Sequence, residues 1–447
     1  MTPGHAKPLL VVGLGMTGAS VLRFCAARGL PADATDNRAQ PPDIEHLRAR
    51  YPECRFAVGA FAAPRGVDGY EAVVLSPGIS PQTPFVAELR AAGLPVMGDI
   101  ELFARAVEAP VVAITGSNGK STTTALLGAM AEAAGVDAGV GGNLGTPALD
   151  LLESQHDLYI LEVSSFQLEV TSSLAAAAAT MLNLSEDHLD RHGSMEAYGA
   201  AKARIYRRCG TAVVNRADAA TLQGSDQARE RRSFALDAPP TDRDYGVITA
   251  DGRDWLAVGS TRLVPTDQIA LRGLHNQANA LAALALAEAA SMPHAPCLEA
   301  LAHFDGLPHR CRLVHTAGGV QWLDDSKATN VGATLAALSG MTGPLIWIGG
   351  GQAKGQNMGP LADALAQQAR LAIVYGQDAD LLGAALDVAG VDTRQVRTLD
   401  EAVEEAAQAS RDGDTVLLSP ACASLDQFPD YRARGDAFAR LAKERAA

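Results

Sequence analysis

The sequence predicts an α/β protein with three domains, each built around its own sheet. The 447 residues are enough for about three domains that each bury a core. Short apolar runs alternate with helical patterns along the chain, which is typical of α/β folds. Glycine turns and polar clusters follow these runs, and ligands bind at that carboxyl edge of open α/β sheets. We expect the domains at residues 1–98, 99–306 and 307–447.

The first domain opens with an expected strand at residues 9–12, the glycine turn Gly13-Leu-Gly-Met-Thr-Gly18 and a helix. A second strand ends at Asp36, and a third, at 72–75, leads into the turn at 76–79. The glycine turn and the acidic residue Asp36 together match the dinucleotide-binding fingerprint. Taken alone, this match would indicate an NAD-dependent oxidoreductase. The alternative is that the glycines serve only close helix–strand packing, without a ligand. Because the same turn can hold any diphosphate, and a dehydrogenase needs no further nucleotide loop, we favour a non-redox nucleoside diphosphate site.

The second domain carries a phosphate loop. An apolar strand at 111–114 is followed by a glycine-rich turn, and a helix begins at Lys120 and ends near Gly135. Backbone N–H groups and a helix N-terminus would face an anion, with Lys120 for the terminal phosphates and a hydroxyl for Mg²⁺. Ile114 stands where a full Walker A motif has Gly. The sequence therefore predicts ATP binding at Gly116, Ser117, Asn118, Gly119, Lys120, Ser121 and Thr122.

Two strands after this loop are followed by titratable residues that could have a functional role. Glu162 lies near the end of an apolar strand at 158–163, where a lone carboxylate would cost several kcal/mol to bury. Mg²⁺ shared with the loop hydroxyl would satisfy Glu162, and a capping or ion-paired acid is the alternative. His188 follows a strand at 180–184, a position that taken alone is more often structural. Two helices and a Pro-, Asp- and Arg-rich loop insertion at 237–244 complete the domain.

In the third domain, polar residues again follow the expected strands, at 320–323, 345–348 and 415–418. Lys327 could bind a phosphate or carboxylate, although Ser326 or Thr329 could instead serve as a helix N-cap. Lys354 lies in a glycine-rich segment and could face an anion.

The composition limits the partners. There are 51 Asp and Glu against 37 Lys and Arg, a net charge of −14 without a basic block, so we expect no nucleic-acid partner. No apolar run approaches the ~18 residues of a membrane span, and the N-terminus lacks a signal-peptide core. The six cysteines form no CxxC pair, which favours reduced core thiols. We expect a cytoplasmic protein that is not bound to a membrane.

Taken in order, the motifs resemble those of the Mur ligases, the family that builds peptidoglycan precursors. The matching segments are 13–18, 76–79, 98–103, 116–122, 142–143, 162–167, 183–188, 201–206, 273–279, 307–310, 325–330 and 419–428. They cover essentially the full chain. Two departures concern the amino-acid pocket: Met358 stands where an aromatic is common, and Tyr431 where the family can have Phe.

The resemblance implies a Rossmann-like UDP-binding domain, a central P-loop ATPase domain and a Rossmann-like C-terminal domain. The implied reaction couples D-glutamate to UDP-N-acetylmuramoyl-L-alanine through an acyl phosphate, with ATP and two Mg²⁺ ions. Lys202 is implied to be carbamylated by CO₂, and a monomer acting on small molecules is expected.

The resemblance also assigns roles to residues. The implied catalytic residues are Lys120, Glu162, His188 and Lys202, and the implied metal ligands are Ser121, Glu162, His188 and Lys202. Adenosine would contact Asn276, Asn279, Arg310 and Asp325. D-glutamate would contact Lys327, Thr329, Lys354, Ser424, Leu425 and Tyr431. The UDP-sugar substrate would contact Met16, Thr17, Asp36, Asn37, Ser76 and Gly78, with Asn143, Ser164 and Gln167 nearer its muramoyl arm.

Three other classes stay open at this point. One is an NAD-dependent oxidoreductase, and another is a related ligase, such as a different Mur enzyme or a folylpolyglutamate synthase. The folate enzyme is disfavoured because its phosphate loop lies near its N-terminus. The third is a non-catalytic nucleotide-binding protein, which the presence of Glu162, His188 and Lys202 disfavours.

Overall fold

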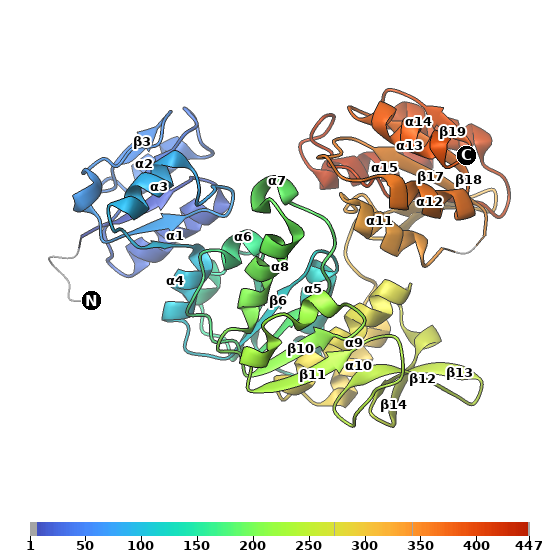
Figure 1. Cartoon of the computed structure of the whole chain (residues 1–447), viewed down its shortest axis with the longest axis horizontal. Coiled ribbons are helices and arrows are strands. Elements are labelled where there is room, and N and C mark those ends of the chain that lie inside the picture. The colour runs from blue at the N-terminus through green and yellow to red at the C-terminus, as the bar shows by residue number, and fades with distance from the viewer. Residues whose placement is uncertain (1–6, 272, 342, 446–447) are drawn as a thin grey trace.

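The computed structural model describes residues 7–445 apart from 272 and 342, and it confirms the predicted three-part α/β fold. It contains three separate sheets, of five, nine and six strands. In Figure 1 the N-terminal part is blue, the central part green to yellow, and the C-terminal part orange to red. Residues 1–6, where we expected no signal sequence, lie outside the described residues.

The N-terminal sheet is parallel throughout and has the order β3-β2-β1-β4-β5. Its strands are β1 (Leu9–Val12), β2 (Ala32–Asp36), β3 (Phe56–Val58), β4 (Ala72–Leu75) and β5 (Val96–Met97). Its helices are α1 (Met16–Ala27), α2 (Ile44–Arg50) and α3 (Pro84–Ala91). At Gly18 a Cβ atom would lie 2.0 Å from the Gly13 carbonyl oxygen, so the turn between β1 and α1 requires glycine there.

The central sheet has the order β14-β13-β12-β11-β10-β9-β6-β8-β7. Its strands are β6 (Val111–Thr115), β7 (Ala138–Gly142), β8 (Leu158–Glu162), β9 (Ala178–Met181), β10 (Thr211–Asn215), β11 (Glu230–Phe234), β12 (Tyr245–Ala250), β13 (Arg253–Val258) and β14 (Thr261–Pro265). The helices of this part are α4 (Asp99–Ala106), α5 (Lys120–Ala133), α6 (Ser165–Leu168), α7 (Leu189–His192), α8 (Met195–Ala203), α9 (Leu274–Ala289) and α10 (His294–His303). Helices α5, α9 and α10 bury their apolar residues together with this sheet in one core.

Two features of the central part differ from the expectation. The strand expected at 180–184 ends at Met181, because Asn183 instead exchanges hydrogen bonds with the backbone of Asn118 in the phosphate loop. The loop expected at 237–244 is followed by the antiparallel strands β12 to β14, which the sequence interpretation missed.

The C-terminal sheet has the order β15-β16-β20-β17-β18-β19, with only its β15–β16 pairing antiparallel in the described part of the chain. Its strands are β15 (Arg312–Ala317), β16 (Val320–Asp324), β17 (Leu345–Gly350), β18 (Ala369–Tyr375), β19 (Thr393–Gln395) and β20 (Thr415–Leu418). Its helices are α11 (Val331–Leu338), α12 (Gly359–Gln368), α13 (Ala379–Val388), α14 (Leu399–Ala409) and α15 (Tyr431–Arg445).

The domains contact one another through polar groups as well as through apolar packing. In the N-terminal contact, Arg23 forms a bidentate pair with Asp150, and Ser20 donates to the same carboxylate at 2.7 Å. All six cysteines are free thiols. Among residues 7–271, 273–341 and 343–445, none of the helices is both long enough and apolar enough to span a membrane.

Candidate active site

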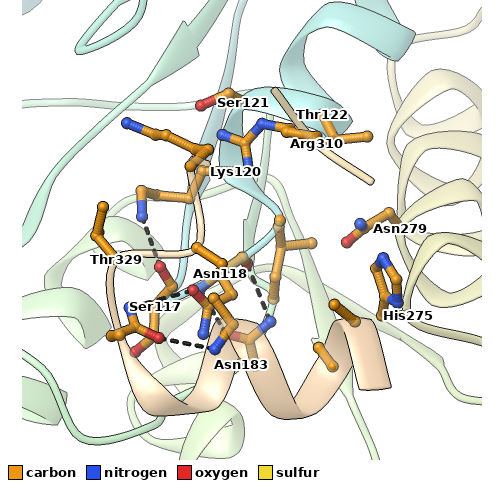
Figure 2. A pocket seen from close by; sticks show the side chains of 18 of the residues that line it. Ser117, Asn118, Lys120, Ser121, Thr122, Asn183, His275, Asn279, Arg310 and Thr329 are labelled. Carbon is orange, nitrogen blue, oxygen red and sulfur yellow. Dashed lines mark hydrogen bonds between the residues drawn. The ribbon is translucent and has the colours of Figure 1, made fainter. Parts of the chain in front are cut away.

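A cavity of about 440 Å³ opens between the central and C-terminal domains (Figure 2). It collects residues from the phosphate loop, from the ends of β8, β9 and β16, and from α9 and α11. The expected site residues that line it are Ser117, Asn118, Gly119, Lys120, Ser121, Thr122, Asn143, Glu162, His188, Asn276, Asn279, Arg310, Asp325, Lys327, Thr329 and Lys354. Residues that are up to about 240 positions apart in the sequence therefore meet at one seam.

The phosphate loop connects β6 to α5, and its glycines are required by its shape. Gly116 and Gly119 both have positive φ, and a Cβ at Gly119 would lie 2.4 Å from Asn279 Oδ1. Lys120 is the first residue of α5, and its ammonium donates to the carbonyls of Gly116 and Ser117 at 2.9 Å. Burial lowers the pKa of Lys120, which the nearby Glu162 partly opposes. This arrangement places a cation and the N-terminus of α5 where a phosphate chain would bind.

Glu162 ends β8 directly beside Ile114 of β6, so its carboxylate lies next to the start of the phosphate loop. The side chain is 2 % exposed; Oε1 accepts a hydrogen bond from Asn143 Nδ2 at 2.8 Å, and Oε2 has no partner among the described residues. An orphaned buried carboxylate oxygen is costly unless a cation or a donor satisfies it. Oxygen ligands suit Mg²⁺, so Glu162 and the Ser121 hydroxyl fit such an ion.

Within the described residues no group of three His, Cys, Asp or Glu side chains is arranged to hold a metal ion. A hard cation here would therefore have to complete its shell with the Ser121 hydroxyl, water and phosphate oxygens. That requirement is typical of Mg²⁺ sites that form together with a bound nucleotide.

Lys202 lies at the end of α8 and is 1 % exposed. Its nitrogen donates to the Gly116 carbonyl at 2.8 Å and lies 4.7 Å from the centre of the Tyr198 ring. Burial, reinforced by the charge of Lys120, lowers the pKa of Lys202 well below its ordinary value. The neutral amine is therefore strongly favoured compared with that of an exposed lysine.

His188 occupies the N-cap position of the short helix α7 with a left-handed backbone, with φ of 54°. Burial lowers the pKa of this imidazole, although the neighbouring Asp187 raises it. A neutral imidazole is the form that binds a metal ion.

On the α9 side of the cavity, Asn276 and Asn279 are buried, and the amide of Asn279 donates to Asn276 Oδ1 at 3.2 Å. Across the cavity, burial raises the pKa of Asp325 to about 7. The carboxylate of Asp325 accepts hydrogen bonds from Ser419 Oγ at 2.7 Å and from the Cys311 N–H at 3.2 Å.

Residues expected to hold the amino acid are only partly assembled. Lys327 stacks over Tyr431 with 3.9 Å between its nitrogen and the ring centre, and burial, with Arg310 nearby, lowers the pKa of Lys327 to about 8. Ser424 is buried and Leu425 is 64 % exposed, and neither of them lines the cavity. Of this group, Lys327, Thr329 and Lys354 line the cavity, whereas Ser424, Leu425 and Tyr431 do not.

The residues expected to hold the UDP portion lie in the N-terminal domain and do not line this cavity. Met16 is 78 % exposed, and Ser76 donates to the Gly13 carbonyl at 2.8 Å. The carboxylate of Asp36 accepts hydrogen bonds from the Leu14 N–H at 2.7 Å and from the Arg38 guanidinium. Asp36 therefore holds the glycine turn and Arg38 together.

Ser164 and Gln167 form a capping box at the start of α6. The Gln167 amide also donates to Asp99 at 3.0 Å. These side chains shape the turn after Glu162.

Sequence reasoning gave no role to Arg38, Asp187, Tyr198 and Asn330. Asp187 and Asn330 lie within polar clusters that were recognised, and Arg38 follows Asp36 by two residues, so these three had a local signal. Tyr198, whose hydroxyl lies 3.2 Å from Ser117 Oγ, had none.

Comparison with known sequences gives consistent matches along the chain. Three family models match: "Mur ligase MurD-like, N-terminal domain" at residues 7–98, "Mur ligase middle domain" at 114–287 and "Mur ligase, glutamate ligase domain" at 309–422. The UDP-N-acetylmuramoylalanine–D-glutamate ligase of Nitrosococcus oceani is 48% identical, covering 99% of this chain and 98% of that protein. The enzyme of the same name from Pseudomonas aeruginosa is also 48% identical, covering 98% of each.

Solved structures resemble this one in fold. A pseudomurein peptide ligase type C from Methanothermus fervidus matches with a TM-score of 0.62 at 17% identity, covering 98% of this chain and 99% of that chain. UDP-N-acetylmuramate-alanine ligase MurC from Thermotoga maritima matches with a TM-score of 0.60 at 18% identity and the same coverage. With three family models in chain order and full-length relatives at 48% identity, the chain belongs to the Mur ligase family.

Proposed function

We infer that this chain is an ATP-dependent ligase that adds D-glutamate to UDP-N-acetylmuramoyl-L-alanine in the synthesis of peptidoglycan precursors. The observation that carries the inference is the full-length identity of 48% to enzymes named for this product. The cavity supports it, because it combines a phosphate loop with lysines from a second domain.

The chemistry explains why the site needs these groups. A carboxylate is a poor electrophile, so it first takes the γ-phosphoryl group of ATP and becomes an acyl phosphate. Lys120 and the loop N–H groups would stabilise the charge that spreads over the transferring group. The amine of D-glutamate then attacks the acyl carbon and phosphate leaves. An acyl phosphate hydrolyses in water, which favours an enclosed site at a domain interface.

Mg²⁺ would neutralise phosphate charge when bound. We propose that Ser121 and Glu162 hold one ion, and that His188 and a carbamate on Lys202 hold a second. The unpartnered Glu162 oxygen supports the first assignment. The lowered pKa of Lys202 supports the second, because CO₂ adds to a neutral amine.

The carbamate can be tested without measuring turnover. Protein equilibrated with ¹³C-bicarbonate should show a carbamate carbonyl resonance that Lys202→Ala lacks. Lys202→Ala should also lose activity, and a short carboxylic acid at high concentration should restore part of it. A spectrum that is the same for the wild type and Lys202→Ala would refute the modification and leave the ligase assignment in place.

We propose that the N-terminal domain holds the UDP portion through the expected contacts at Met16, Thr17, Asp36, Asn37, Ser76 and Gly78. Asn143, Ser164 and Gln167 would lie nearer the muramoyl arm, and Lys327, Thr329, Lys354, Ser424, Leu425 and Tyr431 would hold D-glutamate. Adenosine would contact Asn276, Asn279, Arg310 and Asp325. We also propose domain boundaries near residues 98 and 306, and a monomer that works in the cytoplasm.

The deciding experiment is phosphate release from ATP with UDP-N-acetylmuramoyl-L-alanine and one of four amino acids. D-glutamate should support release, whereas L-glutamate, L-lysine and meso-diaminopimelate should not. Preference for another amino acid would move the assignment to a different Mur ligase. If the protein instead reduces NAD in a separate assay and releases no phosphate from ATP, it is an oxidoreductase.

A further inference from the structure

The turn of residues 187–192, called here the junction turn, contacts all three domains. It follows β9 in the central domain and includes α7. In Figure 1, α7 stands at the top of the central domain, between the N-terminal and C-terminal domains. Its first residues, Asp187 and His188, line the nucleotide cavity.

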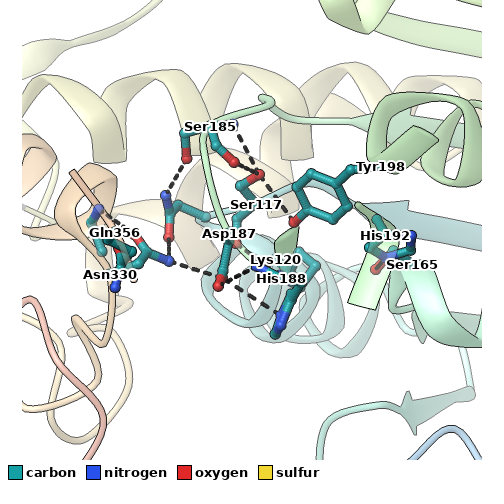
Figure 3. Close-up of polar contacts among 12 residues, drawn as sticks. Ser117, Lys120, Ser165, Ser185, Asp187, His188, His192, Tyr198, Asn330 and Gln356 are labelled. Carbon is teal, nitrogen blue, oxygen red and sulfur yellow. Dashed lines mark hydrogen bonds and ion pairs between the residues drawn. The ribbon is translucent and has the colours of Figure 1, made fainter. Parts of the chain in front are cut away.

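The contact with the C-terminal domain runs through Asn330 (Figure 3). This residue is 4 % exposed, and its Oδ1 caps α11 by accepting the Ala333 N–H at 2.8 Å. Its Nδ2 donates across the interface to Asp187 Oδ2 at 3.2 Å and to Asn118 Oδ1 at 3.3 Å. One amide therefore caps its own helix and joins two segments of the central domain.

Asp187 passes this contact to His188. Its Oδ1 accepts the His188 N–H at 2.9 Å, and its Oδ2 lies 3.5 Å from His188 Nε2. The oxygen that accepts from Asn330 is thus the one nearest the imidazole. A shift of the C-terminal domain would displace this carboxylate and, with it, the histidine.

The contact with the N-terminal domain runs through Arg191. Its Nη2 donates to the Ile79 carbonyl at 3.2 Å and to Glu169 Oε2 at 2.8 Å. The guanidinium also stacks over Phe166, 4.7 Å from the ring centre. Ile79 ends the turn at 76–79, which the proposed function assigns to the UDP-sugar substrate.

The far end of the junction turn is fixed within the central domain. His192 is buried, with Nδ1 3.2 Å from Glu169 Oε1 and Nε2 3.0 Å from Ser165 Oγ. The Phe166 ring packs against both histidines, with 4.8 Å between its centre and that of the His188 ring and 5.5 Å to that of the His192 ring. The turn therefore has a fixed base, and its other contacts depend on the outer domains.

We propose that Asn330 and Arg191 are positioning residues that set the place of His188 according to whether the outer domains are seated on the junction turn. This rests on the proposed function, in which His188 holds a metal ion during phosphoryl transfer. Neither residue needs to touch a reacting atom. Each acts through the turn, so the loss of either should lower kcat and weaken the response to Mg²⁺.

The first experiment exchanges donor and acceptor across the interface. Asn330→Asp keeps an oxygen to cap α11 but sets a carboxylate against that of Asp187, which is unfavourable for two ionised groups. We expect kcat to fall at least about tenfold and the half-saturating Mg²⁺ concentration to rise, with the melting temperature nearly unchanged. The double variant Asn330→Asp/Asp187→Asn restores one donor and one acceptor, and it should recover activity at least about threefold over Asn330→Asp.

If Asn330 and Asp187 only stabilise the fold, kcat should fall in step with the melting temperature. The proposal is wrong if kcat falls in this way in every variant, or if the double variant has no higher kcat than Asn330→Asp.

The second experiment tests whether the two positions act through one turn. Arg191→Met keeps a stem over Phe166 and removes the hydrogen bonds, and Arg397→Met, at an 89 % exposed side chain, is the matched control. Changes at sites without shared partners add, whereas coupled sites do not. We expect Arg191→Met and Asn330→Asp together to cost clearly less than the product of their separate effects on kcat, because either one already releases His188.

If the effects of Arg191→Met and Asn330→Asp on kcat multiply, the two residues do not act through one turn. The proposal is also wrong if Arg397→Met lowers kcat as much as Arg191→Met does. All assays start from wild-type protein that releases phosphate with D-glutamate. If the proposed function is wrong, the wild type itself will not do so. If only the role of the junction turn is wrong, the wild type will be active and the variants will not behave as expected.

Discussion

Lys120 is a half-buried cation held by two carbonyls of its own loop, at 2.9 Å each. A bound phosphate chain offers the same ammonium group anionic oxygens instead, and these are stronger partners. The loop carbonyls can therefore hold the Lys120 ammonium in the absence of a nucleotide, and the ammonium can still bind the phosphates when a nucleotide arrives.

Lys120→Ala should lower kcat at least about a hundredfold, because it removes a fixed charge from the transferring phosphoryl group. The fold should survive, since the ammonium donates to two backbone carbonyls of its own loop, those of residues 116 and 117. Phosphate release and circular dichroism measure the two properties. A folded variant that keeps more than about a tenth of wild-type kcat would contradict this role, because that loss is only about 1.4 kcal/mol.

Asp36→Ala should raise the KM of the UDP-sugar substrate about tenfold and leave that of ATP nearly unchanged. Its carboxylate holds both the Leu14 N–H of the glycine turn and the Arg38 guanidinium. Those groups are in a different domain from the nucleotide cavity. Steady-state kinetics with each substrate varied in turn provide the check, and equal rises in both KM values would count against two separate nucleotide sites.

The place of a residue in the cavity was predictable where the residue type is unusual for its position. Glu162 was found because an acid in an apolar strand needs a partner, and Lys120 because it follows a glycine turn. Asn330 could not be found in this way. The sequence interpretation placed the helix cap at Ser326 or Thr329, whereas the structure places it at Asn330. The donor bond of Asn330 reaches a residue 143 positions away.

At the scale of elements, the strands and helices of the α/β units were predictable, whereas the added antiparallel strands β12 to β14 were missed. The pattern of strand, glycine turn and helix fixes β6 and α5, because each has its own periodicity. The hairpins β12–β13 and β13–β14 have two-residue connections at Asp251-Gly252 and at 259–260, both with positive-φ residues. An Asp-Gly pair between short runs is a hairpin signal, so this extension could have been recognised.

The anchoring of α4 should depend on pH. Burial raises the pKa of Glu101, but hydrogen bonds from the N–H groups of Ser172 and Ser173, together with Arg105, lower it to about 2. The ordinary value is 4.5, so this carboxylate contributes stability above that pH, and the contribution is lost as the pH falls towards 2. The melting temperature of Glu101→Gln should lie below that of the wild type at about pH 7, and the gap should narrow at about pH 3. A gap that does not change with pH would exclude this linkage.

On the scale of the whole molecule, the sequence predicted three domains but gave no information about how they meet. The seam between the central and C-terminal domains is close-packed at Gly332, where a Cβ would lie 2.8 Å from Ser185 Oγ and 3.1 Å from Ser185 Cβ. Contacts of this kind join residues that neither periodicity nor a motif can relate.

Gly332→Ala should separate stability from activity. Alanine favours the helix by about 1 kcal/mol, so α11 should not be destabilised, yet the added methyl group should push the two domains apart. We expect lower kcat with an unchanged or higher melting temperature. Gly383→Ala in α13, where the nearest atom would be 3.4 Å away, is the control that should leave kcat unaltered. Equal kcat in both variants would show that the seam tolerates the methyl group.

The free thiols have a practical consequence. Burial raises the pKa of Cys25, Cys54, Cys209, Cys297 and Cys422 to about 11 or 12, and that of Cys311 well above its ordinary value. At neutral pH these thiols therefore stay protonated, and the thiolate is the form that reacts with maleimides. A cysteine introduced on an exposed surface would therefore be labelled far faster than any native one. Fluorophore pairs could then be attached to two domains of the otherwise unaltered chain, so that their separation can be followed during turnover.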